Sequence, residues 1–190
     1  MEREVLELAK NPNFKDLAQP RIDILGAGLG RDLLWINQAM DADCYVKVYD
    51  MSHVACEGIL SNFNYSKHKG YHLEVVQGEI KTHWNSDNVL IYYASQFIQV
   101  QKRPRMRSCM RHLGSLLKRS FSGFKPTLYL VHPFGKDNPD AQWGDTTPYS
   151  EEEMLDAMER KGRKEATVEL LGVHSYFHQK YSLLKIRNKG

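Results

Sequence analysis

Three glycines at alternate positions, Gly26, Gly28 and Gly30, follow the apolar run 22–25, and a helical pattern begins after them. A residue without a Cβ can take a positive φ, and it lets a ligand lie directly against the backbone. The expected helix begins with N–H groups that have no partner inside the helix, and these favour a polar or anionic ligand. The stretch is therefore typical of a strand, a tight turn and a helix start that bind an adenosine-containing cofactor.

An acidic residue follows the glycines where a ribose would lie, about 20 residues further on. The strand-forming run 44–50 ends in Asp50, whose carboxylate can accept hydrogen bonds from both ribose hydroxyls. The third glycine of the dinucleotide motif G-x-G-x-x-G is replaced by Arg31, which disfavours NAD. Asp50 is the cofactor-binding residue that the sequence predicts most directly.

The G-x-G-x-G motif, followed by Arg31 and Asp32, resembles the first motif of class I S-adenosylmethionine-dependent methyltransferases. The resemblance implies that the cofactor is S-adenosyl-L-methionine (SAM). It also implies the residues that bind it: Gly26, Ala27, Gly28, Gly30, Asp50, Met51, Glu79 and Tyr93. In this assignment Met51 packs on the adenine and Glu79 lies near its amino group. The alternatives are a core position for Met51 and a solvated loop charge for Glu79.

The chain departs from this family at one position before the glycines. Many members have an acidic residue two positions before the first glycine, where it helps to hold the methionine amino group, whereas this chain has Ile24 there and its acid at Asp23. Successive side chains of a strand point to opposite faces, so the shift is not neutral. Either the turn differs locally or another group binds the ammonium. Asp32 has a separate explanation, because the helix dipole favours a carboxylate in the first turn.

The elements that must position these residues alternate between strand and helix, which predicts a parallel sheet with helices on both faces. Expected strands lie near residues 21–25, 44–50, 73–77, 88–94, 127–132, 168–174 and 181–186, and expected helices at 53–63, at 104–121 and from Ser150. The last two strands would form an antiparallel hairpin, as in class I methyltransferases. We therefore expect a Rossmann-like, mostly parallel sheet of seven strands with a C-terminal antiparallel hairpin.

Length and composition predict a single class I methyltransferase domain over residues 1–190, with residues 1–18 as an N-terminal helix outside the core fold. No apolar run reaches the roughly 20 residues that span a bilayer, and no signal peptide is recognisable, so the expected location is cytoplasmic without a membrane. The cysteines are Cys44, Cys56 and Cys109. Their odd number and the lack of a C-x-x-C spacing argue against a disulfide framework and a zinc cluster.

Residues at the carboxyl ends of the strands are the candidates for substrate chemistry, because ligands of such sheets bind there. His132 ends the fifth expected strand and His174 the sixth. An imidazole with a pKa near 6.5 is a suitable base for a hydroxyl. We therefore expect His132 to be the catalytic base, with His174 as the second candidate. A structural histidine is the alternative for each. Expected substrate contacts are Trp143 and Tyr149, from the long loop 134–149, and Tyr176.

The absence of motifs found in other methyltransferases narrows the range of expected methyl acceptors. The fourth strand ends in Tyr-Tyr-Ala-Ser-Gln, where enzymes that methylate exocyclic base or glutamine amines carry Asn/Asp-Pro-Pro-aromatic. The acidic set that binds magnesium in catechol-type enzymes is also not recognisable. The resemblance therefore favours metal-independent methylation of a small molecule. A hydroxyl is the preferred acceptor group, ahead of an amine or a thiol.

Two other functions stay open. Methylation of RNA or protein is suggested by basic residues along the expected helix 104–121, although such a stripe is also typical of a solvated helix face. These residues are Arg105, Arg107, Arg111, Lys118 and Arg119. The formal net charge of +3 is too small to imply nucleic acid by itself. A non-catalytic adenosyl-binding module is the other alternative, because Ile24 replaces the usual acid. The oligomeric state does not follow from the sequence.

Overall fold

The computed structural model describes residues 21–34, 44–63, 71–78, 89–95, 97, 101–118, 125–132, 149–158, 166–176 and 179–188. The expected N-terminal helix 1–18, Trp143 and Glu79 lie outside these residues. The chain divides into two compact units, Met1–Leu90 and Ile91–Gly190. Within the described residues, the helices are too short or too polar to cross a membrane.

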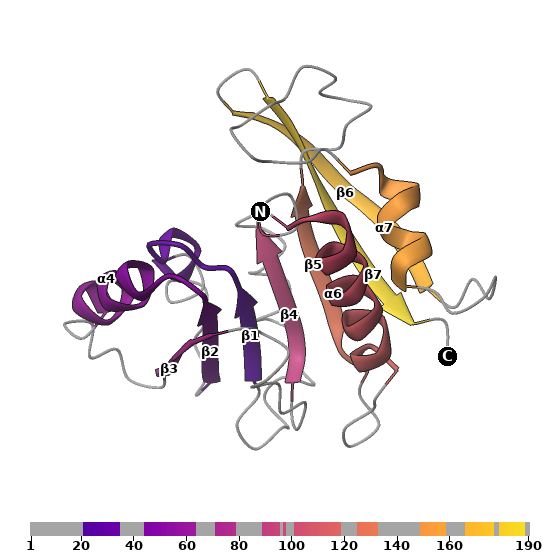
Figure 1. The fold of residues 1–190 in the computed structure, drawn as a ribbon. Helices are drawn as coiled ribbons and strands as arrows, with labels where there is room; N and C mark the ends of the chain where they lie inside the picture. The colour runs from indigo at the N-terminus through magenta and orange to yellow at the C-terminus, as the bar shows by residue number, and fades with distance from the viewer. Residues whose placement is uncertain are drawn as a thin grey trace. The chain divides into compact units, whose positions relative to one another are not determined.

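Seven strands form one sheet in the order β3-β2-β1-β4-β5-β7-β6 (Figure 1). The strands are β1 (Arg21–Leu25), β2 (Cys44–Asp50), β3 (Tyr71–Gln77), β4 (Val89–Ser95), β5 (Thr127–His132), β6 (Ala166–Tyr176) and β7 (Gln179–Asn188). The pairs β1–β2, β2–β3 and β4–β5 are parallel, whereas β7 is antiparallel to both β5 and β6. The expected mostly parallel sheet with a C-terminal antiparallel hairpin is confirmed.

The first unit contains β1, β2, β3 and the helix α4 (His53–Phe63). All five residues of β1 are buried, as expected for a strand in a parallel sheet that is covered on both faces. Four residues of α4 are buried: Ala55, Cys56, Ile59 and Phe63. They pack this helix beside β2 and β3, next to the end of the glycine-containing turn.

In the second unit the helices α6 (Arg103–Leu116) and α7 (Glu151–Met158) pack against each other (Figure 1). The predicted apolar stripe of α6 is buried: Met106, Cys109, Met110, Leu113, Leu116 and Leu117. The predicted helix continued to residue 121, whereas α6 ends at Leu116, because helical periodicity locates a buried face more reliably than a boundary. The Ser150 hydroxyl caps α7 by accepting a hydrogen bond from the Glu153 N–H at 3.0 Å, which confirms the expected helix start.

Candidate functional site

The turn between β1 and the following helical residues, residues 26–30, is called the glycine turn below. Gly26, Gly28 and Gly30 have φ values of 66°, 55° and 82°, a region that residues with a side chain rarely adopt. The Gly26 N–H donates a hydrogen bond to the Tyr49 carbonyl oxygen at 2.8 Å, and the Gly30 N–H donates one to the Ala27 carbonyl oxygen at 3.0 Å. The turn is thus tight, and its first residue is joined to the end of β2.

The second and third glycines meet different surroundings. Gly28 is exposed, and a Cβ added to it would have no other atom within 4 Å. Gly30 is buried, and a Cβ added there would lie 3.0 Å from Cε2 of Phe63 and 3.1 Å from Cγ1 of Ile59, both in α4. Gly28 therefore leaves open space where a ligand can lie against the backbone, whereas Gly30 allows close contact between the turn and α4.

Asp50, the last residue of β2, is fixed by backbone N–H groups on both carboxylate oxygens. The Gly28 N–H donates to Oδ2 at 2.9 Å, and the Ser52 N–H donates to Oδ1 at 2.8 Å. The Asp50 carbonyl oxygen accepts a hydrogen bond from Gly78, just after β3, at 3.0 Å. A carboxylate oxygen can accept more than one hydrogen bond, so the oriented carboxylate can still bind a diol.

Met51, which directly follows Asp50, is 53% exposed, so it does not fill the core. Four further large apolar side chains of the first unit are also exposed: Leu29 in the glycine turn, Val54 near the start of α4, Leu34 and Leu60. Leu29 lies over α4, because a Cβ on Gly58 would be 3.3 Å from its Cδ2. These side chains offer apolar surface beside the polar glycine turn.

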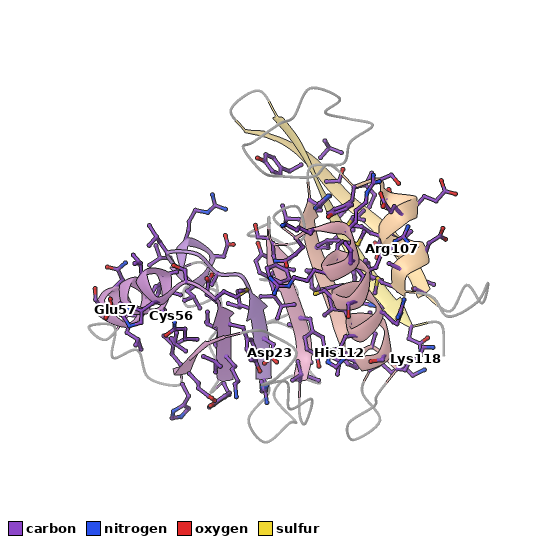
Figure 2. All side chains as sticks on the ribbon, viewed as in Figure 1. Asp23, Cys56, Glu57, Arg107, His112 and Lys118 are labelled. Carbon is purple, nitrogen blue, oxygen red and sulfur yellow. The ribbon has the colours of Figure 1, made fainter. Side chains whose placement is uncertain are left out.

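The structure separates the roles of Asp23 and Ile24. Ile24 is 1% exposed and occupies the position where many class I methyltransferases have a carboxylate. Asp23, labelled in Figure 2, is fully buried. It forms an ion pair with Arg21, with 2.6 Å between Asp23 Oδ1 and Arg21 Nε. Burial raises the pKa of Asp23 to about 6, although Arg21 opposes the shift. Asp23 therefore does not replace the missing carboxylate at Ile24.

In the second unit, the structure brings His132 and Tyr149 together. Their rings stack with 6.3 Å between centroids, and both side chains are fully buried. Burial lowers the pKa of His132 to about 4, against an opposing hydrogen bond with the Tyr149 backbone. The Tyr149 hydroxyl donates a hydrogen bond to the Gln101 carbonyl oxygen. Tyr93, an expected cofactor contact, is also buried at 3% exposure.

The other expected site residues are located only by their backbone or lie outside the described residues. His174 and Tyr176 are at the end of β6, paired in register with Tyr181 and Gln179 of β7. In the described part of the chain, no three side chains of His, Cys, Asp or Glu are grouped so that they could hold a metal ion.

The sequence interpretation did not identify Arg21 and Tyr49 as residues of interest. Arg21 Nη2 donates a hydrogen bond to the Tyr49 hydroxyl at 3.0 Å, in the buried surroundings of Asp23. The available signal was the recurrence of polar residues at alternate positions, 21 and 23 in β1 and 45, 47 and 49 in β2. Such alternation places them on one face of the sheet.

No model of a known protein family matches the sequence, and no curated protein matches it either. Several solved structures match the fold along nearly the whole chain. The magnesium protoporphyrin IX methyltransferase from Synechocystis PCC 6803, solved with bound SAM, is 13% identical and has a TM-score of 0.69. The match covers 98% of this chain and 78% of the methyltransferase.

Two other structures extend the range of similar proteins. The YcgJ protein from Bacillus subtilis is 11% identical, with a TM-score of 0.64, and the match covers 100% of this chain and 98% of YcgJ. The small RNA methyltransferase HEN1 is 14% identical, with a TM-score of 0.69, and the match covers 100% of this chain but 25% of HEN1. At these identities the similarity establishes the fold: this chain has the Rossmann-like fold found in SAM-dependent methyltransferases.

Proposed function

We propose that this chain is a SAM-dependent methyltransferase that acts on a small molecule without a metal, and that the preferred methyl acceptor is a hydroxyl group. The observation that carries the proposal is the pairing of Gly28 and Asp50. An exposed glycine at positive φ donates its N–H to the carboxylate that ends β2, at 2.9 Å. This geometry combines open backbone with an oriented acceptor for a ribose. SAM or its product S-adenosylhomocysteine (SAH) is bound in structures of one methyltransferase with this fold.

The described residues of the first unit fit an adenosyl cofactor. Gly28 leaves space for a ligand against the backbone, and Asp50 offers its carboxylate to the ribose hydroxyls. The exposed side chain of Met51 supplies an apolar surface for the adenine. Glu79, the residue after the described Gly78, is proposed to accept a hydrogen bond from the adenine amino group.

When bound, SAM supplies a methyl group made electrophilic by its attachment to a sulfonium. The task left to the protein is to align the acceptor and to take up its proton. A base has to touch the acceptor hydroxyl, and the full burial of His132 favours His174 for this role. His132 then holds Tyr149 in the interior through the stacked rings. Trp143 and Tyr176 are the proposed substrate contacts.

Calorimetric titration with SAM, SAH and NAD tests the cofactor assignment. We expect micromolar binding of the two adenosyl compounds, no binding of NAD, and loss of binding in Asp50→Ala. Asp156→Ala is the matched control, because Asp156 is an exposed carboxylate on α7. Binding of NAD alone, or equal affinity in Asp50→Ala, would refute the assignment.

A screen of acceptors separates an enzyme from a binding module. Release of SAH with a phenol or another hydroxyl compound, and loss of that release in His174→Ala with unchanged cofactor affinity, would support the proposed reaction. Binding of SAM without turnover on hydroxyl, amine or thiol acceptors, and without turnover on RNA, would instead identify the chain as a non-catalytic adenosyl-binding module.

RNA is a second candidate substrate, favoured by the exposed basic face of α6. Arg105, Arg107 and Arg111 of α6 are exposed, as is Lys118 just after the helix; Arg107 lies in the first half of α6 and Lys118 beyond its other end (Figure 2). The helix contains no acidic residue. Arg107 and Arg111 are four residues apart, an arrangement in which like charges destabilise a helix slightly. An extended polyanion would relieve this repulsion, and HEN1 provides one RNA methyltransferase with the same fold.

Binding of labelled single-stranded RNA at several salt concentrations tests this candidate. Under the RNA hypothesis, affinity falls steeply with salt, and Arg107→Ala with Arg111→Ala reduces both the affinity and the salt slope. Arg187→Ala is the control, because it removes an exposed cation of β7. Equal binding by the double variant and the control would show that the basic residues of α6 form a solvated helix face and do not bind RNA.

A further inference from the structure

The buried polar residues of β1 and β2 form a connected cluster next to the glycine turn. Arg21 binds Asp23 with two hydrogen bonds, from Nε to Oδ1 at 2.6 Å and from Nη2 to Oδ2 at 2.9 Å. Arg21 Nη2 also donates to the Tyr49 hydroxyl at 3.0 Å, and that hydroxyl lies 3.4 Å from Asp23 Oδ2. The three residues Arg21, Asp23 and Tyr49 are called the Arg21 cluster below. It joins β1 to β2 through side chains on one face of the sheet.

Tyr49 connects this cluster with the proposed cofactor site. Its carbonyl oxygen accepts the Gly26 N–H at 2.8 Å, and Leu25, the residue before Gly26, is its partner in the strand register. The next residue, Asp50, holds the Gly28 N–H. A shift of Tyr49 would therefore move both contacts between the glycine turn and the end of β2, the backbone hydrogen bond of Gly26 and the hydrogen bond of Gly28 to the Asp50 carboxylate.

A gain in the free energy of unfolding is a poor explanation for the Arg21 cluster. Removing a carboxylate and a guanidinium from water is costly, and replacing such a pair by apolar residues is often neutral or stabilising. The raised pKa of Asp23 shows that burial outweighs the attraction of Arg21 for this carboxylate. A bidentate guanidinium–carboxylate pair instead fixes the position of the two side chains relative to each other.

We propose that Arg21, Asp23 and Tyr49 are positioning residues, which fix Tyr49 so that the glycine turn and Asp50 keep the spacing that binds the cofactor. This inference rests on the proposed function and deepens it. It also gives Asp23 a role other than the direct contact with the methionine amino group that a carboxylate at position 24 would make. None of the three residues has to touch the cofactor.

The test compares two tyrosines of β2 in which only the hydroxyl is removed. Tyr49→Phe removes the contact with Arg21 and Asp23, whereas the control Tyr45→Phe removes a hydrogen bond to Glu74 on the same face of the sheet. The measurements are the dissociation constant of SAH by calorimetry, the melting temperature, and the hydrogen-exchange rate of the Gly26 amide by NMR without ligand.

We expect Tyr49→Phe to weaken SAH binding by roughly tenfold, the effect of losing one hydrogen bond to a charged group. We also expect exchange at the Gly26 amide to become faster, while Tyr45→Phe changes neither quantity. Asp23→Asn, which keeps the shape of the side chain, is the second variant should Tyr49→Phe not fold, and the same result is expected. A folded variant with wild-type SAH affinity and Gly26 exchange, or equal weakening in Tyr45→Phe, would overturn the positioning role.

Failure of the proposed function gives a different result. If the wild-type chain binds neither SAM nor SAH, the cofactor assignment is refuted, but Gly26 exchange in the ligand-free protein still tests whether the Arg21 cluster fixes the turn.

Discussion

The carboxylate of Asp50 and the backbone N–H of Gly28 are joined by a hydrogen bond of 2.9 Å, across 22 positions of the sequence. Gly28 makes this contact with a φ of 55°, and the space that a Cβ on Gly28 would point into is open. The contact unites the two sequence signals, glycines and acid, in one proposed binding site. It also ties the conformation of the turn to the residue expected to hold the ribose.

Replacing Asp50 by Asn tests this contact with little change in shape. The amide has one oxygen, so it cannot accept both the Gly28 and the Ser52 N–H groups and also hold a diol as a carboxylate can. We expect SAH affinity to fall by roughly 10- to 100-fold, since hydrogen bonds to charged groups contribute about 1.5–3 kcal/mol each. Calorimetry measures the loss, and an affinity within twofold of wild type would contradict it.

Gly28 and Gly30 should respond differently to alanine. Gly28→Ala meets no neighbouring atom, so its cost to stability is limited to the positive φ, about 1–2 kcal/mol, while the new methyl group enters the proposed ligand space. Gly30→Ala adds contacts of 3.0–3.2 Å with Phe63, Ile59 and Leu33, so it should lower stability further, by about 1–3 kcal/mol.

Urea unfolding without ligand and SAH titration of the folded proteins separate the two effects. We expect Gly28→Ala to lose more free energy of SAH binding than free energy of unfolding. Gly30→Ala should lose more free energy of unfolding than Gly28→Ala. If Gly28→Ala binds SAH as well as the wild type, the cofactor does not lie against this glycine.

The raised pKa of Asp23 predicts a pH dependence of stability. Its folded-state pKa of about 6 exceeds the ordinary value of 3.8, so the folded state binds this proton more tightly than the unfolded state. The stability contributed by the proton is complete below pH 3.8 and is lost as the pH rises through about 6. Denaturation midpoints at several pH values should therefore fall relative to those of Asp23→Asn across this window. Parallel curves for the two proteins would contradict the raised pKa.

His132 should act in the opposite direction. Burial lowers its pKa from 6.5 to about 4, so the unfolded state binds this proton more tightly. Stability from the neutral ring is complete above pH 6.5 and is lost as the pH falls toward 4. The NMR resonance of the His132 ring should stay constant between pH 5 and pH 8, assigned by comparison with His132→Gln. A titration midpoint near 6.5 would show that the ring is accessible to solvent.

Gly114 is expected to be required for the contact between α6 and α7. Alanine at a helix position normally stabilises by about 0.5–1 kcal/mol relative to glycine. Here the added Cβ would lie 2.5 Å from the Met158 carbonyl oxygen, so α7 must move, at a cost of about 1–3 kcal/mol. Thermal unfolding of Gly114→Ala should show a net loss, while the neighbouring exposed control Ser115→Ala changes little. A more stable Gly114→Ala would show that α7 can move away freely.

Local sequence patterns were sufficient for the order of the elements. The turn chemistry of the three glycines, the strand that ends in Asp50 and the apolar stripe of α6 are properties of short segments, and these segments adopt the expected conformations. The antiparallel terminal hairpin followed from two strand-forming runs with a short connection. Such features depend on residues near one another in the chain, so they can be recognised without a structure.

The tertiary structure decided the roles of individual side chains. Asp23 and Ile24 are adjacent in sequence, yet one pairs with Arg21 and Tyr49 while the other packs as an apolar residue, because alternate residues of a strand face opposite sides. The burial of His132 against Tyr149 likewise depends on contacts between segments that are distant in sequence. The sequence determined which local elements form, whereas burial and partners, which set the pKa values and the accessibility of these side chains, arise only when the chain is folded.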